Sequence, residues 1–554
     1  NFISFYSNLY YSFECFRKED NLLSKNTEVN LSNYFQLPNP GLKSYFGNVV
    51  KGQSSVYDTP FARGESTQEL LDNWREILES IRKDWPTLWD FENDLAEKVG
   101  PLSVMKPLKE RIPDIDHYYE DILLSSEPIH ERALGAVISE WDAARGLNLR
   151  SQKLTVDVMK KSTNSGNPYF TKRRDVVAQT IPLHASVRND KVLQVLPAGD
   201  WESCAVLGWR GQEGGYEKED VKQRVVWMFP FGINVLELQC YQPLIEEAQR
   251  FSLVPAWVGT DAVDSRITAM FDSKADKDLV VCTDFSKFDQ HFNHSMQTGA
   301  MTILTAILAR NATTQSWLEN VFPIKYMIPL MYDYGKIRIG KHGMGSGSGG
   351  TNADETLAHR ALQYEAAILN EARLNPNSQC LGDDGILTYP GITVEDVVKA
   401  YSKHGQEMNE SKQYASTQDC VYLRRWHHTK YRQNGICVGV YSTMRALGRL
   451  RYLERFQSPE WWDEKMVALR QLSILENVKY HPLKDQFAEF CMRRDKYRLG
   501  VDIPGFLDNI EKITMDAIDH MPEFLGYTKT LAPNKQKAYG IKDWWIVKYL
   551  NSKR

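Results

Sequence analysis

The sequence predicts an α+β fold in which short antiparallel strands are flanked by helices. Apolar and polar residues alternate over 192–240 with many β-branched side chains, a period typical of strands. Apolar residues recur at helical spacing after a capping box of Ser66 and Glu69, until Pro86 ends the helical pattern. Gly-Asp-Asp-Gly at 382–385, between two short apolar runs, predicts a tight hairpin turn.

The composition is that of a globular protein and excludes several classes. The chain has 554 residues, of which 42% are hydrophobic and 25% charged, and its net charge is −4. Any basic binding surface must therefore be local. The eight cysteines are scattered without a CxxC pair, which argues against a zinc site or a disulfide framework. No apolar run approaches the roughly 18 residues of a membrane span, and the aromatic-rich residues 1–16 predict an arm packed on the body rather than a signal peptide.

Acidic residues mark the ends of two predicted strands. The apolar run 278–283 predicts a buried strand, Asp284 follows where the strand emerges, and Asp289 comes after four intervening residues. A buried, unpaired carboxylate is costly, so we expect a metal or another cation as its partner. Asp383 and Asp384 in the hairpin turn repel one another unless a cation lies between them, which favours a metal-binding turn.

A glycine-rich loop at 343–350 lies between a predicted strand, 336–339, and a predicted helix that begins near Thr351. Backbone N–H groups at a helix start point outward, so this arrangement predicts an anion-binding site. The Gly-x-Gly-x-x-Gly spacing could indicate a dinucleotide site, but the acid at the expected distance, Glu371, falls on the continuing helix. A P-loop is excluded because no lysine follows the glycines.

Two groups of cationic residues precede the acids. Lys222 and Arg224 lie on one face of a predicted strand and suit a triphosphate, with ordinary charges on a half-exposed strand as the alternative. A Gly/Pro loop followed by cations could hold a phosphate backbone, and a solvated surface loop is the alternative. The triphosphate candidates are Arg210, Lys218, Lys222 and Arg224. The backbone candidates are Thr163, Asn164, Ser165, Gly166, Pro168, Lys172 and Arg173.

Together these residues predict phosphoryl transfer. Two carboxylate strands side by side can hold two Mg²⁺ ions about 4 Å apart, one activating an attacking hydroxyl and one clamping the leaving phosphate. Lys222 and Arg224 could neutralise the phosphates. The predicted reaction is in-line attack of a 3′-hydroxyl on the α-phosphate of a nucleotide.

The ordered set of motifs over 163–428 resembles that of viral RNA-dependent RNA polymerases, and among them the picobirnavirus and partitivirus group, picobirnaviruses in particular. The loop 163–169 resembles the template-entry loop, 222–224 the cationic strand of the fingers, and 422–425 the primer-grip hairpin. The remaining matches are Asp284 and Asp289 to D-x4-D, Ser346, Gly347 and Thr351 to S-G-x3-T, and Gly382, Asp383 and Asp384 to Gly-Asp-Asp.

The resemblance implies a right-hand polymerase fold of fingers, palm and thumb. Its antiparallel palm sheet would be flanked by helices, and the fingers and thumb would be mostly helical. The implied boundaries are an N-terminal arm (1–65), fingers (66–262), a first part of the palm (263–295), an insertion of the fingers (296–340), a second part of the palm (341–435), and a thumb with C-terminal tail (436–554).

The resemblance also implies roles for single residues. Asp284 and Asp383 would be the principal ligands of two Mg²⁺ ions, for which Mn²⁺ can substitute, and Asp384 an auxiliary ligand. Asp289 would read the ribose 2′-hydroxyl together with the serine and threonine of the S-G-x3-T motif. Many families have Asn four residues after that threonine, whereas this chain has Glu355.

Further candidates follow from the same resemblance. Asn352 is the candidate substitute for the missing Asn in ribose binding. Lys412 is the candidate general acid that protonates pyrophosphate, and Arg424 and Arg425 of the primer-grip hairpin are candidates for RNA contact.

The implied activity is template-directed RNA synthesis from NTPs, in genome replication and transcription, by a monomer that needs no membrane. The implied partners are template RNA, nascent RNA and viral capsid protein, inside the virion or in the host cytoplasm. A start without a primer would need an aromatic support, for which loop 527–539 and the tail with Trp544 and Trp545 are candidates. Packing against the body is the alternative for these aromatic residues.

Two alternative functions stay open at this point. A reverse transcriptase would keep the paired acids but would favour a bulky aromatic in place of Asp289 and a Y-x-D-D turn. A non-catalytic, RNA-binding, capsid-associated protein would keep the cationic surfaces but would not need all three acids.

Overall fold

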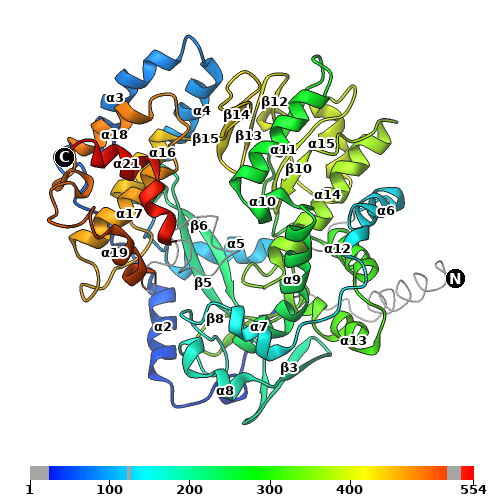
Figure 1. The fold of residues 1–554 in the computed structure, drawn as a ribbon. Helices are drawn as coiled ribbons and strands as arrows, with labels where there is room; N and C mark the ends of the chain where they lie inside the picture. The colour runs from blue at the N-terminus through cyan, green and yellow to red at the C-terminus, as the bar shows by residue number, and fades with distance from the viewer. Residues whose placement is uncertain (1–23, 121–125, 519, 521–537) are drawn as a thin grey trace.

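The structure, a computed structural model, describes residues 24–120, 126–518, 520 and 538–554 (Figure 1). Among these residues, no helix has the length and apolar character needed to cross a membrane. The arm predicted at 1–16 lies outside the described residues.

A four-stranded antiparallel sheet, called the central sheet below, has the strand order β10-β11-β7-β12. Successive side chains of β7 point to opposite faces, as the period of a strand requires. Val281 packs in one hydrophobic cluster with α14, whereas Val280 and Cys282 pack in another with α11, so helices cover both faces. The bounds are β7 (Val280–Thr283), β10 (Gln379–Leu381), β11 (Asp384–Leu387), β12 (Tyr414–Ser416), α11 (Thr260–Ser273) and α14 (Thr351–Leu369).

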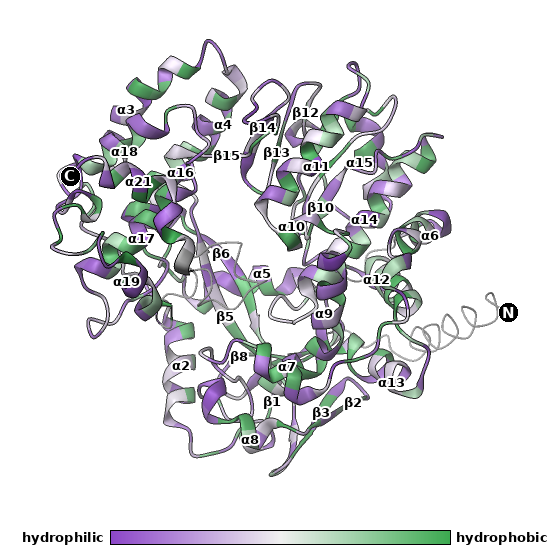
Figure 2. Cartoon of the chain, viewed as in Figure 1, coloured by the Kyte–Doolittle hydropathy of each residue, from purple (hydrophilic) through white to green (hydrophobic). Residues whose placement is uncertain are grey.

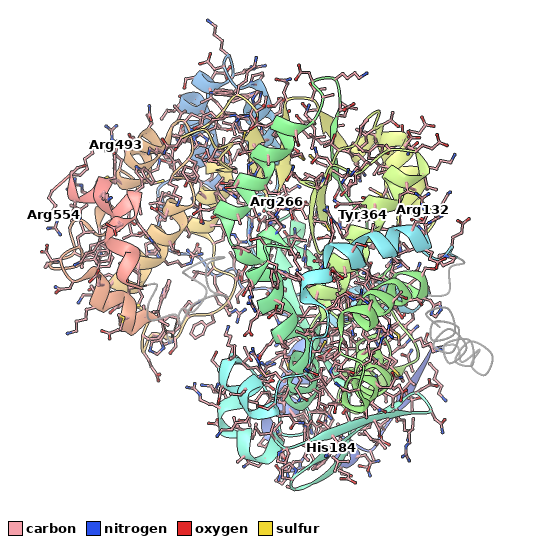
Figure 3. The ribbon with its side chains drawn as sticks, turned by 45° about the vertical axis from the view of Figure 1, so that its right-hand side comes forward. Arg132, His184, Arg266, Tyr364, Arg493 and Arg554 are labelled. Atoms are coloured by element: carbon pink, nitrogen blue, oxygen red, sulfur yellow. The ribbon has the colours of Figure 1, made fainter. Side chains whose placement is uncertain are left out.

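Helix α14 is anchored on several neighbouring helices. It packs against α6 (Glu131–Glu140), α12 (His294–Ile307) and α15 (Val394–Ser402). Glu140 of α6 accepts hydrogen bonds from two residues of α14, the Arg360 guanidinium at 2.7 Å and the hydroxyl of Tyr364, which Figure 3 labels. These charge-assisted bonds fix the helix that carries the predicted ribose-binding residues.

A second sheet, in the order β1-β9-β8-β5-β6, is assembled from three distant parts of the chain. The hairpin of β5 and β6 supplies one edge, β8 runs parallel to β5, and the N-terminal β1 pairs with β9. The bounds are β1 (Lys25–Glu28), β5 (Ala205–Gln212), β6 (Lys222–Met228), β8 (Leu330–Asp333) and β9 (Lys336–Ile339), with α2 (Pro40–Lys51), α5 (Leu108–Glu120) and α9 (Phe231–Arg250) packed nearby.

Helices α3 and α4 share a hydrophobic core with the C-terminal helices rather than with the hairpin of β5 and β6 (Figure 1). Hydrophilic and hydrophobic residues alternate along them (Figure 2), and the buried ring of Trp74 lies 4.9 Å from that of Phe487. The boundary of the fingers at 66–262, which includes these two helices, stays a prediction. An apolar stripe shows that a helix has a buried face but not which element covers it. The bounds are α3 (Thr67–Leu78), α4 (Pro86–Ala96), α16 (Thr443–Arg451), α17 (Glu464–Glu476), α18 (Lys484–Met492), α19 (Ile510–Ala517) and α21 (Trp545–Asn551).

The described residues also form two three-stranded sheets and four short helices around the elements above. The sheet β13-β14-β15 lies against β7 and β11 of the central sheet, whereas β2-β3-β4 lies apart from it. The bounds are β2 (His184–Arg188), β3 (Lys191–Leu196), β4 (Gly199–Glu202), β13 (Asp419–Tyr422), β14 (Arg425–His428), β15 (Val440–Tyr441), α7 (Gln152–Val158), α8 (Val177–Thr180), α10 (Pro255–Val258) and α13 (Ala312–Asn320).

Candidate active site

Asp284 and Asp384 lie opposite one another at one end of the central sheet. Strand β7 pairs with β11 in a register that aligns Thr283 with Gly385, and the next position on each side is an aspartate. Side chains at opposed positions of neighbouring strands have Cβ atoms about 4.5–5.5 Å apart. Both aspartates line a cavity of about 370 Å³, so the structure brings these two predicted residues together.

Asp383 lies in the two-residue turn that joins β10 to β11. The first turn residue, Gly382, has a φ of 58°, which glycine adopts without steric cost. Two residues of α14 fix it: the Thr356 hydroxyl accepts its N–H at 2.9 Å, and His359 Nδ1 donates to its carbonyl at 2.8 Å. Burial lowers the pKa of His359 to about 4, which keeps the ring neutral in this role.

The carboxylates at this end carry negative charge that the protein does not fully neutralise. Burial, and then the charge of Asp383, raise the pKa of Asp384 to about 7, although a backbone N–H and Arg424 oppose the shift. Desolvation, and then the charge of Asp289, raise the pKa of Asp383 against the opposing charge of Arg224. A bound cation would stabilise the ionised form of both groups, so the electrostatics favour a cation here.

The hairpin of β13 and β14 reaches the same end of the sheet. Its turn residues, Leu423 and Arg424, have φ values of 53° and 57°, a region that residues with side chains seldom occupy. The Leu423 N–H donates to Asp384 Oδ2 at 2.8 Å. The strained turn thus orients this carboxylate through its backbone.

Gln413 is a site residue that was not predicted from the sequence. Its side-chain Oε1 accepts the N–H of Asp284 at 2.7 Å, and its Nε2 donates to the Asp284 carbonyl at 2.9 Å. The two bonds hold Asp284 beyond the end of β7. They depend on the pairing of β12 with β7, which no local sequence pattern reveals. Lys412, the predicted general acid, comes directly before Gln413 and is exposed.

The donor set fits Mg²⁺. Within the described part of the chain, no group of three or more His, Cys, Asp and Glu side chains is arranged to hold a metal ion by itself. Mg²⁺ in nucleotide-handling sites takes one or two protein carboxylates and completes its shell with water and substrate phosphates. Asp284, Asp383 and Asp384 offer such hard oxygen donors without forming a closed cage.

Glu355 lies beside Asp289, the second acid of the D-x4-D pair. Its side chain is only 5% exposed. Burial raises its pKa well above the ordinary value, followed by Asp289 through charge and a hydrogen bond, and by Asp383. A protonated carboxyl can donate a hydrogen bond to Asp289, as the Asn amide of the common pattern would. Asn352, the predicted substitute, has its side-chain oxygen occupied by the Trp257 indole N–H at 2.8 Å.

The glycine-rich loop 343–350 packs tightly against β6. A Cβ added to Gly347 would lie 1.6 Å from the carbonyl oxygen of Trp227, so only glycine fits. The Ser346 hydroxyl donates to a carbonyl of β6 at 3.3 Å, and the Thr351 hydroxyl donates back into the loop at 3.1 Å. The carbonyl of Asp289 accepts a loop N–H at 2.8 Å, which joins the predicted ribose-binding residues in one cluster.

Arg224 lies within electrostatic reach of the acids, because its charge acts on the pKa of Asp383. It faces Arg210 across the β5–β6 pair, and Arg210 forms an ion pair of 3.4 Å with Glu454. Of the four triphosphate candidates, Arg224 is therefore the one whose charge acts on the predicted catalytic acids. The two others lie in and next to the loop that joins β5 to β6 and are exposed: Lys218 and Lys222.

The loop 163–169 is fixed inside the fold. Ser165 is 2% exposed, and Gly166 and Pro168 are buried as well. The Arg173 guanidinium donates to Asn234 Oδ1 at 2.8 Å and lies over a phenyl ring of α9. These four residues hold the loop in place, which differs from the predicted contact with RNA. The candidates that retain exposed or half-exposed side chains are Thr163, Asn164 and Lys172.

Arg425 also differs from its prediction. Its guanidinium donates two hydrogen bonds of 2.9 Å to the carboxylate of Asp264, and its side chain is 11% exposed. This bidentate pair ties β14 to α11 and leaves no charge for RNA. Arg424, in contrast, is 42% exposed and lies 3.7 Å from Glu213.

The family described as viral RNA-dependent RNA polymerase matches residues 145–437, more than half of the chain. The chain belongs to this family. A potential RNA-dependent RNA polymerase of human picobirnavirus (strain Human/Thailand/Hy005102/-) is 59% identical over 527 residues, which cover 94% of this chain and 98% of that protein.

Solved structures agree with the sequence comparison. The crystal structure of the RNA-dependent RNA polymerase of a human picobirnavirus has a TM-score of 0.91 at 58% identity, covering 95% of this polymerase and 100% of that chain. An insertion loop deletion mutant of such a polymerase has a TM-score of 0.89 at 57% identity, with the same coverage. The predicted α+β polymerase fold is confirmed, and the polymerase is an RNA-directed nucleotidyltransferase. Its membership decides against a reverse transcriptase and against a non-catalytic scaffold.

The polymerase also has a cationic cluster at the cavity to which the sequence analysis gave no role. Arg445 and Arg449 on α16 line the cavity together with Arg424. Glu213 lies 3.1 Å from Arg445, and Glu454 lies 2.9 Å from Arg449. Their spacing of four residues predicts one helical face, but only the fold shows that this face is turned toward the aspartates.

Proposed function

We propose that the polymerase joins nucleotides by two-metal-ion catalysis at Asp284, Asp383 and Asp384, and that it starts RNA chains without a primer. The observation that supports the first part is the placement of the three carboxylates at one end of the central sheet, two of them with raised pKa values. When bound there, Mg²⁺, or Mn²⁺ in its place, would lower the pKa of the attacking 3′-hydroxyl and neutralise the leaving pyrophosphate.

The residues of the chain position the reactants around these carboxylates. The 3′-oxygen forms a bond to the α-phosphorus, the bond to the β-phosphate oxygen breaks, and pyrophosphate leaves. Arg224, with Lys222, Lys218 and Arg210 further along the same hairpin, would attract the triphosphate. Lys412 would give its proton to the departing pyrophosphate.

Ribose selection is assigned to the cluster of Asp289, Ser346 and Thr351. Asp289 would accept a hydrogen bond from the 2′-hydroxyl of the incoming nucleotide, with Glu355 beside it as a donor. A deoxynucleotide would leave these polar groups without a partner, which is the physical basis for rejecting it.

For initiation, the C-terminal tail offers less than the sequence predicted. The Trp545 indole N–H donates to Asp485 at 3.3 Å, and its backbone N–H donates to Glu476 at 3.2 Å, so this residue is anchored on the thumb. Of the other candidate, loop 527–539, residues 527–537 lie outside the described residues.

The first experiment is incorporation of radiolabelled NTPs on a single-stranded RNA template with Mg²⁺, with and without a primer. Asp383→Ala and the isosteric Asp383→Asn should each lower incorporation by at least about a hundredfold, because a carboxylate that would stabilise the transition-state charge is lost. Product from the wild type without a primer supports the proposed initiation.

Asp276→Asn, an exposed change with the same loss of charge, is the matched control. The proposed role of the Asp383 carboxylate is wrong if Asp383→Asn and Asp276→Asn both incorporate nucleotides at the wild-type level. Wild-type synthesis that strictly requires a primer contradicts only the initiation part.

The monomeric state and the capsid partner inside the virion or the host cytoplasm remain predictions. Sedimentation of the purified chain tests the first, and co-sedimentation with the capsid protein tests the second.

A further inference from the structure

Helix α9 carries three buried polar residues on one face of an otherwise apolar segment. Asn234, Glu237 and Tyr241 are spaced by three and four residues, which aligns them along the helix. This face is turned toward the glycine-rich loop and the start of α14, since the Tyr241 hydroxyl donates to Asp354 at 2.7 Å. Polar groups buried in this way are retained only where they find partners.

Glu237 is the anchor of the glycine-rich loop. Its side chain is 0% exposed, and its carboxylate accepts hydrogen bonds from the Ser348 hydroxyl, from the Gly349 N–H at 3.2 Å and from the Asn234 amide at 3.1 Å. The Ser348 carbonyl in turn accepts the Thr351 hydroxyl at 3.3 Å. Two hydrogen-bonded steps therefore separate Glu237 from a predicted ribose-binding residue.

Asn234 connects this loop to a second one. Its amide nitrogen donates to the Gly347 carbonyl at 3.2 Å, while its oxygen accepts the Arg173 guanidinium at 2.8 Å. Arg173 belongs to the segment that follows loop 163–169. One side chain on α9 thus contacts both the glycine-rich loop, next to Ser346, and the segment directly after the loop that resembles the template entry.

We propose that Asn234 and Glu237 are positioning residues for nucleotide selection, which hold the glycine-rich loop in the conformation that presents Ser346 and Thr351 to the ribose. The inference rests on the ribose-recognition role proposed above. Neither residue touches the reacting atoms, and both act through the loop backbone.

The glycine content of the loop explains why such anchors are needed. Glycine has more accessible backbone conformations than other residues, so a loop with five glycines between 343 and 350 is held by its contacts rather than by its own dihedral preferences. Loss of an anchor would let the loop sample conformations in which the ribose contacts are not formed.

The test compares kcat and KM for UTP and for 2′-deoxy-UTP during extension of a primed RNA template. The variants are Glu237→Gln, Ser348→Ala and the double variant, and Glu246→Gln is the matched control. Glu246 lies on the same helix but forms an ion pair with Arg150 near the surface. Asp289→Asn probes the ribose role directly.

Glu237→Gln and Ser348→Ala should each lower the preference for UTP about two- to tenfold, as expected from one or two lost hydrogen bonds. Glu237→Gln weakens the contact between these two side chains and Ser348→Ala removes it, so the double variant should lose about as much as Ser348→Ala alone. A merely structural role would lower kcat/KM for both substrates equally, or would change only the melting temperature.

An unchanged preference in both single variants, together with a lowered one in Asp289→Asn, overturns the inference and leaves the ribose role standing. An unchanged preference in Asp289→Asn as well overturns both. Ser348 lies in the loop itself, so Ser348→Ala decides the question alone if Glu237→Gln does not fold.

Discussion

Glu355 can donate a hydrogen bond to Asp289, as an amide would, only while its carboxyl group keeps its proton. The pKa of Glu355 is raised by burial first and by Asp289 second, so the folded chain holds a proton that the unfolded chain releases near the ordinary value of 4.5. The stabilisation that belongs to this proton is complete below that value and is lost as the pH rises toward the folded pKa.

Glu355→Gln should therefore remove a pH-dependent cost. At about pH 8 we expect the free energy of unfolding of the variant to exceed that of the wild type by about 1–3 kcal/mol, so the variant melts at a higher temperature. Near pH 4.5 the two proteins should have the same stability. Thermal melts across this range, without divalent metal, check the prediction. A difference that is constant with pH would contradict the proton-holding role, and Glu246→Gln serves as the control.

Single residues also show what could be predicted from sequence at this scale. Asp284 and Asp383 were predicted because spacing and charge repulsion mark them locally. Gln413 was missed because its role depends on how two strands far apart in sequence pair. Arg173 and Arg425 were assigned to RNA because a sequence shows that a guanidinium is present but not that a buried amide or carboxylate already binds it.

Among the elements, α4 and α16 are joined by a buried carboxylate. Glu92 on α4 is 0% exposed and accepts the Thr443 N–H at 3.1 Å, the Thr443 hydroxyl and His481 Nε2 at 3.2 Å. It thereby caps the first turn of α16, the helix that presents Arg445 to the cavity. The negative charge at this helix N-terminus is also favourable for the helix dipole.

Glu92→Ala should destabilise this part of the molecule by about 2–4 kcal/mol, since it leaves buried donors without an acceptor. Urea unfolding followed by tryptophan fluorescence measures the loss, because Trp74 lies in the same core and donates to Thr443 at 2.7 Å. Glu97→Ala, an exposed change at the end of α4, should have little effect. Equal effects of the two changes would contradict the capping role.

Elements with strong local signals were predictable. The capping box of Ser66 and Glu69 is present, but α3 ends at Leu78 rather than continuing to Pro86, where α4 begins. The partner of these helices was not predictable, because Trp74 needs an apolar surface but does not specify one.

Across the whole molecule, ion pairs connect the hairpin of β5 and β6 with helix α16 and the residues that follow it. Glu213, directly after β5, binds Arg445 and Arg424, and Glu454 binds Arg449 and Arg210. The two carboxylates offset part of the positive charge that faces the cavity. They therefore compete with an RNA backbone for the same guanidinium groups.

Glu213→Gln should raise the affinity for single-stranded RNA about two- to fivefold. The slope of log K against log salt concentration should become steeper by about 0.7 for each guanidinium group freed to bind a phosphate. Fluorescence anisotropy of labelled RNA at several salt concentrations checks both. Glu219→Gln makes the same charge change on an exposed part of the hairpin loop. An equal gain in this control would mean that net charge alone is responsible.

The path of the chain before α5 limits how the molecule can move. In the segment between α2 and α3, Gln53 is bridged to Met105, which precedes α5, and Asp58 is bridged to Tyr452, which follows α16. A chain extends by at most about 3.5 Å per residue, so this short segment limits the distance between its two bridges. While both bridges hold, the backbone around Met105 and the backbone around Tyr452 can separate by no more than about the length of this segment.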